Sequence, residues 1–482
     1  MKKYYFNLFA LALVASFGLV SCFENDLDES ASQGFRIDIP VQSVSTKAVT
    51  DNGTSAVATF KTTENVYVYN QSVKAIDDGV LHPSADADET TFTGTLNKTY
   101  SEGNILKVLY NTNSAGVVDY SDQDGAIENV KDAGTGEVTI SSVSGGVITT
   151  TTATMDNLQS IFRFTFTYQG SEISGIRFVR IFSSNGKLQS QYDAVKGTGT
   201  YGPVTISRSD DLADNYVYAG LRFDANGGDQ IVFQVIDANG KVYSGSKNAP
   251  ASGFAVGKFY KTTVAVSLYT FTVASGKKVC FSPGDLGVDG GVYSFTDPFA
   301  TWGWGNSSAS KRVWLNYDEV NYTNIASGHE LYGIKWRIET WKSSYSSVTE
   351  YKYEWNNVIA RTIDGGKVAA FYHVQIGSNK CLLLPPDEAT ESDLEGLTSG
   401  ATITNYVKYL AKGFVLLMNT GYANVVSSGY SWGSDQQGWY WMVRENNTSN
   451  RFYFSWSYSN TPAVSWFANQ ARMRVRYVHD VD

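Results

Sequence analysis

Short stretches in which apolar and polar residues alternate recur along the chain from residue 35 onward. In residues 35–41 every second side chain is apolar, which is the period of a strand with one buried face. Pro40 cannot donate a hydrogen bond to a neighbouring strand, so it indicates an edge position. Further strand-like stretches follow at residues 57–62, 66–69, 105–110, 161–168, 176–182, 216–223, 231–236 and 260–266.

Asn-Gly pairs at Asn185-Gly186 and Asn239-Gly240 are typical of hairpin turns between such strands. Many short strands with turns at regular intervals favour β-sandwiches. The chain has 482 residues, which is too long for one hydrophobic core. The pattern therefore predicts a mainly β protein of several domains, with divisions near residues 22, 155 and 271.

Composition narrows the function. The formal net charge of −9, without a basic stripe, argues against nucleic-acid binding. The four histidines are scattered, no phosphate-binding glycine motif follows a strand, and no pair of carboxylates sits in an apolar setting. We therefore expect no metal or other cofactor and no enzymatic activity.

The first 22 residues have the form of a secretory signal. Lys2 and Lys3 precede an apolar run over residues 6–20, and the segment ends Leu19-Val20-Ser21-Cys22. This ending resembles the lipobox of bacterial lipoproteins, which implies cleavage after residue 21 and acylation of Cys22. The alternative is an ordinary signal followed by an unrelated cysteine.

Acidic residues lie directly after Cys22, within residues 24–29. In lipoproteins of Bacteroides-type bacteria such residues often accompany export to the outer face of the outer membrane. A solvated linker would have the same composition. We expect a protein on the cell surface that contacts the membrane only through its lipid anchor.

Two more cysteines, Cys280 and Cys381, each lie in an apolar, strand-like run. Export makes a disulfide between them possible. Buried thiols are the favoured interpretation, because cysteine in such runs usually packs as a small apolar residue.

The lipobox, the alternating first strand and the run Phe60-Lys-Thr-Thr-Glu-Asn-Val-Tyr-Val-Tyr69 together resemble fimbrillin-like subunits, the type V pilins of Bacteroidota. Tyr216-Val-Tyr-Ala219 and Gly257-Lys-Phe-Tyr260 resemble the second sandwich of those pilins. The resemblance implies two pilin-type β-sandwiches, over residues 22–154 and 155–270.

The same resemblance implies that the chain is cut after its first strand and that a pilus shaft subunit donates a β-strand to the groove left behind. Lys47 and Ala48 occupy the expected cutting region, where family members often have Arg. The alternative is that residues 35–41 remain the first strand of a monomeric sandwich.

Residues 271–482 resemble the Fibrobacter-type major paralogous domains, a branch of the C-type-lectin-like α+β fold. The motifs that recur in order are Trp302-Gly-Trp-Gly305, Trp336-Arg337, Leu382-Leu-Leu-Pro-Pro-Asp387, Gly438-Trp-Tyr-Trp441 and Arg474-Val-Arg476. The stretch 349–361 is the best helix candidate. The oxygen ligands of a Ca²⁺ site cannot be assembled from this segment, and the acidic run over residues 387–395 has the composition of a solvated loop.

The last seventy residues combine short apolar strands with segments rich in Trp, Tyr, Asn and Ser. We expect loops at residues 424–438, 444–450 and 455–470 to form a recognition surface on a rigid scaffold. The candidate ligand-binding residues are Tyr430, Trp432, Arg444, Asn446, Asn447, Tyr453, Trp456 and Tyr458.

Lectin-fold domains with such C-terminal residues are frequent targets of diversity-generating retroelements, although ordinary loops have the same composition. At least two of the tryptophans would suit a core equally well. The sequence thus favours a pilus tip adhesin that binds a protein or glycan ligand. The alternative is a surface lipoprotein outside any pilus.

Overall fold

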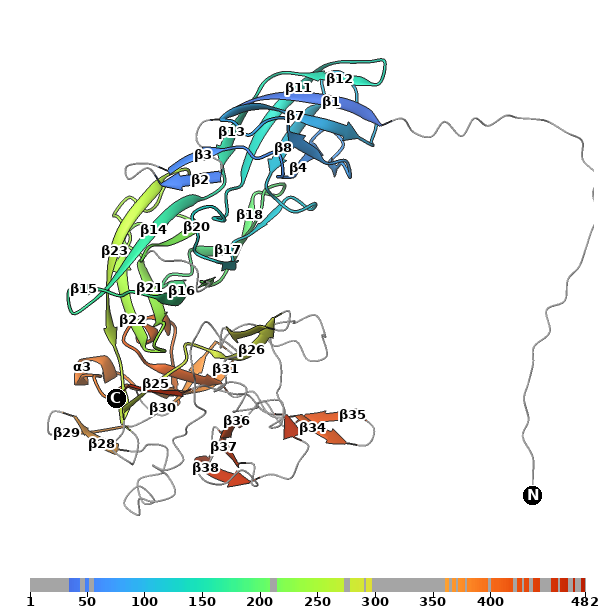
Figure 1. Cartoon of the computed structure of the whole chain (residues 1–482). Coiled ribbons are helices and arrows are strands. Elements are labelled where there is room, and N and C mark those ends of the chain that lie inside the picture. Colours follow the sequence, from blue (N-terminus) through green and yellow to red (C-terminus); the bar gives the residue numbers. More distant parts are fainter. Residues whose placement is uncertain are drawn as a thin grey trace, which may run out of the picture.

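The computed structural model describes residues 34–43, 48–51, 56–208, 215–272, 278–289, 292–296, 360–363, 366–369, 372–377, 379–397, 400–418, 423–426, 429–432, 437–442, 452–457, 460–466, 471–472 and 478–481. These residues form a mainly β protein with two short helices, α3 (Glu391–Leu394) and α4 (Val407–Leu410). The β-rich units follow one another along an elongated molecule (Figure 1). The mainly β class expected from the alternating pattern is therefore confirmed.

The first unit is a sheet whose hydrogen-bonded ladder closes on itself. Starting at β1 and returning to it, the ring runs β1, β13, β11, β8, β4, β6, β7. Its strands are β1 (Phe35–Ser43), β4 (Val66–Asn70), β6 (Leu81–Pro83), β7 (Glu89–Leu96), β8 (Ile105–Tyr110), β11 (Gly134–Ser144) and β13 (Ala153–Asn157), with β5 (Ala75–Ile76) and β12 (Val147–Thr150) at its margins. A closed ring leaves fewer exposed strand edges than an open sheet.

β1 is the strand that closes this ring. It pairs with β7 at eight successive positions, and on its other side it runs parallel to β12 and then to β13. Ile37, Ile39 and Val41 are almost fully buried in the core of the first unit. The first strand expected from the sequence is therefore confirmed.

The edge position expected from Pro40 is wrong. Parallel partners are recorded for Arg36 and Ile37 on β12 and for residues 41–43 on β13, and the ladder is interrupted between them. Pro40 lies within that interruption, so its missing N–H falls where this side of β1 has no ladder partner. A proline was compatible with an interior strand because the neighbouring strand changes at this point.

A buried carboxylate fixes the chain at the end of β7, the antiparallel partner of β1. Asp77 accepts hydrogen bonds from the backbone N–H groups of Gly79, Asn97 and Lys98 and from the hydroxyl of Tyr100. Burial alone would raise the pKa of Asp77, but these four donors outweigh it and hold the pKa below its ordinary value. The carboxylate is thus charged at neutral pH and stabilises the turn after Leu96.

The second unit is a β-sandwich whose strands follow the order β10, β19, β16, β21, β22, β23, β14, β20, β17, β18. β23 (Phe259–Leu268) connects the two layers, because one half pairs with β14 (Ser160–Tyr168) and the other with β22 (Val242–Asn248). The remaining strands are β9 (Val117–Asp119), β10 (Asp122–Gln123), β15 (Ser171–Glu172), β16 (Ile176–Ser183), β17 (Leu188–Asp193), β18 (Thr198–Tyr201), β19 (Val204–Ser207), β20 (Val217–Phe223) and β21 (Gln230–Asp237).

The first unit contributes two short strands and several core residues to the second unit. β9 and β10, which lie within residues 22–154, pair with β17 and β19 of the second unit. Leu109 of the first unit belongs to the core of the second, and Tyr67 and Tyr69 pack against it. The chain thus enters the second unit over residues 117–123 before it returns to β11 of the first.

The part beyond residue 270 contains several small sheets. β25 (Lys278–Phe281) pairs with β40 (Val478–Asp480), so the beginning and the end of this part lie side by side. Its largest described sheet has the order β32 (Ala401–Thr402), β30 (Tyr372–Ile376), β31 (Asn379–Leu384), β33 (Val415–Met418). The other strands are β2 (Ala48–Asp51) and β3 (Ala56–Thr59), which pair with each other upstream, and β24 (Phe271–Thr272), β26 (Asp285–Asp289), β27 (Val292–Thr296), β28 (Ala360–Ile363), β29 (Gly366–Ala369), β34 (Ala423–Val426), β35 (Gly429–Trp432), β36 (Gln437–Met442), β37 (Phe452–Ser457), β38 (Asn460–Trp466) and β39 (Ala471–Arg472).

The helix expected over residues 349–361 and the two observed helices differ in position. The predicted helix over residues 349–361 ends in a strand, because Ala360 begins β28; its first part lies outside the described residues. In the described part of the chain, neither helix has the length and apolar character needed to cross a bilayer.

We expect Ile39→Ala to destabilise the first unit by about 2–5 kcal/mol, because Ile39 is fully buried in the strand that closes the ring. Hydrogen exchange of the amides of β1 and β7 measures this directly. The matched control is Arg36→Ala on the same strand, whose side chain is 71% exposed and forms an ion pair with Asp38 at the surface. It should cost about 0–1 kcal/mol. Equal losses in the two variants would contradict the closing role of β1.

Candidate functional site

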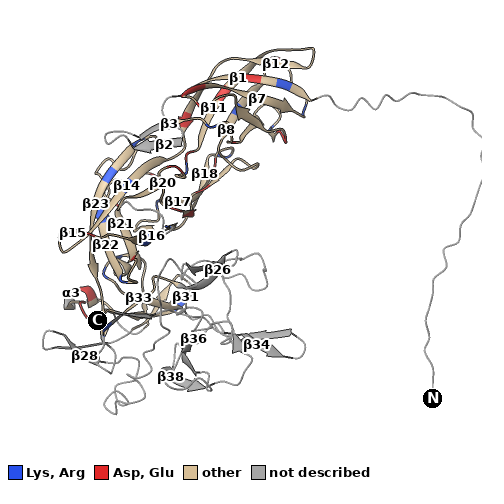
Figure 2. Cartoon of the chain, viewed as in Figure 1, with Lys and Arg blue, Asp and Glu red and all other residues tan. Residues whose placement is uncertain are grey.

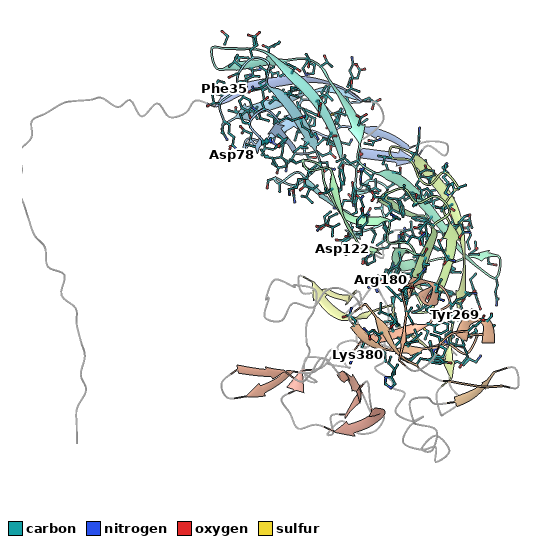
Figure 3. All side chains as sticks on the ribbon, turned by 180° about the vertical axis from the view of Figure 1, so that it is seen from behind. Phe35, Asp78, Asp122, Arg180, Tyr269 and Lys380 are labelled. Atoms are coloured by element: carbon teal, nitrogen blue, oxygen red, sulfur yellow. The ribbon has the colours of Figure 1, made fainter. Side chains whose placement is uncertain are left out.

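The part beyond residue 270 is packed onto one end of the sandwich. Phe182 of β16 and Val232 of β21 belong to the same buried hydrophobic cluster as Leu383, Leu410 and Phe414. Figure 3 shows the labelled residues in order along the molecule, from Phe35 at one end through Arg180 to Lys380. An apolar contact of this kind limits movement between neighbouring domains.

Polar contacts fix the same junction. The backbone N–H and the hydroxyl of Thr270 donate to the Glu388 carboxylate at 2.8 and 2.7 Å, and Asp387 N–H donates to the Thr270 carbonyl at 2.8 Å. The buried guanidinium of Arg180 on β16 donates to the Pro283 carbonyl at 3.0 Å. Hydrogen bonds that involve charged groups are the stronger ones, so these contacts hold the junction in one geometry.

Gly413 allows the closest approach at the junction. A Cβ atom there would lie 2.1 Å from the ring of Tyr269, and the φ angle of Gly413 is +72°. Both the space and the backbone conformation therefore require glycine. Gly413 is followed by the buried Phe414 and then by β33, which begins at Val415.

Four of the C-terminal candidates lie in two separate three-stranded sheets. In the sheet β36–β37–β38, Tyr453 lies opposite Trp441 on one side and Ser465 on the other, and Trp456 lies opposite Gly438. In the sheet β35–β34–β39, Tyr430 lies opposite Val425 and Trp432 lies opposite Ala423. Four of the candidate residues are thus held at fixed positions in backbone ladders.

This placement corrects the expected loops. Residues 424–438 and 455–470 were expected to be loops, yet they contain most of β34, all of β35 and all of β38. Tyr430 and Trp432 lie in β35, and Tyr453 and Trp456 lie in β37. Aromatic residues have a high strand propensity. Pairing with neighbouring strands therefore overrides the polar character that suggested loops.

The other candidates fall outside the described residues, namely Cys22, Lys47, Arg444, Asn446, Asn447 and Tyr458. Ala48, at the expected cutting region, is the first residue of β2, and its backbone pairs with Thr59 of β3. The cutting region therefore leads directly into a short hairpin.

The acidic run over residues 387–395 is more ordered than a solvated loop. Glu388 binds Thr270, and Asp393 lies in α3. Asp393 accepts hydrogen bonds from the N–H and hydroxyl of Thr390 and lies 3.6 Å from the Lys412 ammonium. Burial raises the pKa of Asp393, but these partners outweigh burial and lower it overall. Glu388 and Asp393 thus have structural partners.

The two cysteines are buried and do not form a disulfide, which confirms the favoured interpretation. Burial raises the pKa of the Cys280 thiol to about 12 and raises that of Cys381 even further. Burial also lowers the pKa of His373 to about 4. Among the described residues, no group of three or more histidine, cysteine or acidic side chains is arranged to hold a metal ion.

Comparisons with known proteins give structural neighbours only. No family model matches the chain, and no curated protein matches it. A putative cell adhesion protein from Bacteroides uniformis is 14% identical over 48% of this chain and 93% of its own, with a TM-score of 0.31. One from Bacteroides ovatus is 13% identical over 48% and 92%, with a TM-score of 0.33. A fimbrial assembly protein from Parabacteroides distasonis is 11% identical over 48% and 90%, with a TM-score of 0.27.

We expect Cys280 and Cys381 to resist alkylation by iodoacetamide at pH 8 in the native Cys22→Ser chain. Both thiols are buried and protonated at that pH, and only a thiolate reacts readily. Mass spectrometry should find both modified after unfolding in urea, which is the control. Rapid labelling of either residue in the native protein would contradict the buried position.

Proposed function

We propose that this protein is a surface lipoprotein that acts as an adhesin, with its ligand bound by the part beyond residue 300. The observation that carries the proposal is the distribution of tryptophan. All eleven tryptophans lie between residues 302 and 466, although two complete β units lie upstream of residue 270. Tryptophan and tyrosine are enriched at interface hot spots.

The arrangement of the chain supports a ligand site at the end opposite to the anchor. β1 lies at one end of the molecule, and β34 to β38 lie at the other (Figure 1). The contacts of Thr270, Arg180 and Phe182 hold the second β unit and the candidate recognition part in one relative position. A lipid anchor at Cys22 would then hold the aromatic strands away from the membrane.

The particular adhesin that we propose is a pilus tip subunit. In type V pilins, which the chain resembles, a shaft subunit donates a strand from its C-terminus. Here the C-terminal strand β40 pairs with β25 inside a folded part. Such a subunit could accept a donated strand after loss of β1, whereas the pairing of β40 with β25 would keep β40 from being donated. This combination suits the end of a fibre.

A second candidate is a surface lipoprotein outside any pilus, which the register of β1 favours. Removing β1 would leave eight paired positions of β7 and the parallel partners on β12 and β13 without a ladder. The intact ring is a complete fold. Whether β1 is retained therefore separates the two candidates.

We expect pilus-associated copies of this protein to begin near Ala48, because cutting at Lys47 would release β1 and open the ring. N-terminal sequencing of the subunit from sheared and purified pili measures this. Membrane-bound copies from a strain without pili are the control and should begin at acylated Cys22. An intact Cys22 in every pilus-associated copy would reject strand removal and leave the second candidate.

We expect Trp456→Ala to weaken adhesion by about 2 kcal/mol, roughly thirtyfold, if Trp456 anchors the ligand. Adhesion to host cells, or binding to a captured ligand, gives the size of the effect. Tyr201→Ala is the matched control, because Tyr201 is an aromatic residue on β18 of the sandwich with 50% exposure.

Melting followed by tryptophan fluorescence separates recognition from packing, because every tryptophan lies in the candidate recognition part. A core tryptophan lost to alanine should cost about 3–5 kcal/mol of folding free energy, so melting would fall together with binding. Unchanged adhesion in Trp456→Ala, Tyr453→Ala and Tyr430→Ala combined would reject the C-terminal recognition model.

A further inference from the structure

β22 and β23 of the sandwich separate from each other along their length. They are paired only where Tyr243 to Gly245 face Val266 to Leu268. From there β22 continues to Asn248 against β21, and β23 extends back to Phe259 against β14. Between the diverging strands, the core of the sandwich is open to the outside.

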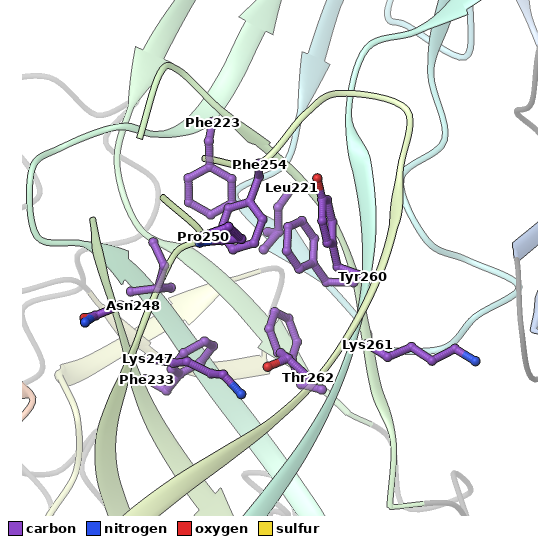
Figure 4. Close-up of a pocket in the computed structure, with 13 residues that line it drawn as sticks. Leu221, Phe223, Phe233, Lys247, Asn248, Pro250, Phe254, Tyr260, Lys261 and Thr262 are labelled. Carbon is purple, nitrogen blue, oxygen red and sulfur yellow. The ribbon is translucent and has the colours of Figure 1, made fainter. Parts of the chain in front are cut away.

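A cavity of about 160 Å³ occupies this opening (Figure 4). Its inner wall is apolar and almost fully buried. The residues of that wall are Phe162, Phe164, Leu221, Phe223, Ile231 and Phe233. An apolar cavity of about 150 Å³ holds one benzene molecule in another protein, so this one has room for a single ring or a short branched chain.

The mouth of the cavity is covered by residues that are themselves held in place. Phe254 and Tyr260 pack edge to face with ring centres 4.9 Å apart, and both contact Phe162. The N–H of Phe254 donates to the Asn226 side chain at 3.0 Å, and the N–H of Ala255 donates to the Tyr260 hydroxyl at 2.9 Å. Fixed walls lower the cost of ordering a site when a ligand binds.

A positive charge stands at the same mouth. The Lys247 ammonium donates to the Thr263 carbonyl at 2.7 Å and thereby spans from β22 to β23. In Figure 4 the Lys247 side chain runs across the opening toward Thr262, whereas Lys261 extends away from the rings. Among the described residues that line the cavity, none is acidic. The charge at the entrance is therefore uncompensated by its lining.

We propose that this cavity binds a small apolar carboxylate, with the ring or chain inside and the carboxylate at Lys247. The apolar wall matches the body of such a ligand, and the ammonium matches its charge. An added peptide strand is less suited to the opening. It would have to break the contact between Lys247 and Thr263, and lysine at a strand edge is a common barrier to strand addition.

The test is binding of 3-phenylpropanoate to the purified full chain by isothermal titration calorimetry at low ionic strength. The neutral 3-phenylpropan-1-ol serves as the matched probe. We expect one site per chain and about fivefold tighter binding of the acid than of the alcohol, because one charge-assisted contact at a solvated mouth contributes modestly. The preference should shrink as salt is added.

Two lysine variants assign the charge. Lys247→Met should remove the preference for the acid and leave binding of the alcohol, while Lys261→Met should keep the preference. Leu221→Phe should abolish binding of both probes by filling the cavity, and Thr262→Leu does the same from the mouth if Leu221→Phe fails to fold. The melting temperature of each variant verifies folding.

Three outcomes would overturn the proposal. The first is the absence of saturable binding by the acid. The second is equal affinity for acid and alcohol in the unmodified chain, or a preference that survives Lys247→Met. The third is binding that persists in a folded variant with a filled cavity. Saturable binding of an extended acidic peptide with one aromatic residue, in place of 3-phenylpropanoate, would assign the opening to strand addition.

Discussion

The pairing of β1 on both of its sides is the constraint on which the first unit depends. β1 supplies eight antiparallel partners to β7, and it supplies parallel partners to β12 and β13. It also places Ile37, Ile39 and Val41 in the core. An unpaired buried N–H or C=O group costs free energy. Without β1, therefore, β7, β12 and β13 could not keep their present positions. The first unit is complete only with this strand, or with another strand in its place.

From this ring the structure is continuous to the C-terminal part. β9 and β10 carry the chain of the first unit into the second, and Leu109 joins the core there. At the other end Phe182 and Val232 belong to the core of the following part. Each junction is an extension of a hydrophobic core, so the three parts form a semi-rigid rod and not independent domains on linkers. Figure 2 shows acidic and basic residues dispersed over the first and second units.

The sandwich also shows how a connection between layers creates a cavity. β23 serves both layers, so it must leave one strand in order to reach the other. The space between is filled by aromatic side chains, but rings of fixed shape cannot fill it completely, and the void that remains is apolar. Lys247 and the loop over residues 249–258 cover the mouth of this cavity. A cavity at this point is a direct consequence of the topology.

The sequence by itself determined some of the strands before residue 270, such as β1, β4 and β8, and the burial of both cysteines, because period-two alternation and apolar runs are local signals. It gave no expectation of β7, β11 or β13. It failed at Pro40, where a partner change between β12 and β13 made an interior proline acceptable. It also failed at Tyr430 and Trp456, which it placed in loops and which lie in paired strands. Only the tertiary structure decided the closure of the ring, the excursion of residues 117–123 and the cavity behind Lys247. Each of these depends on which strands meet, and hydrogen-bonded partners far apart in the chain leave no periodic trace in the sequence.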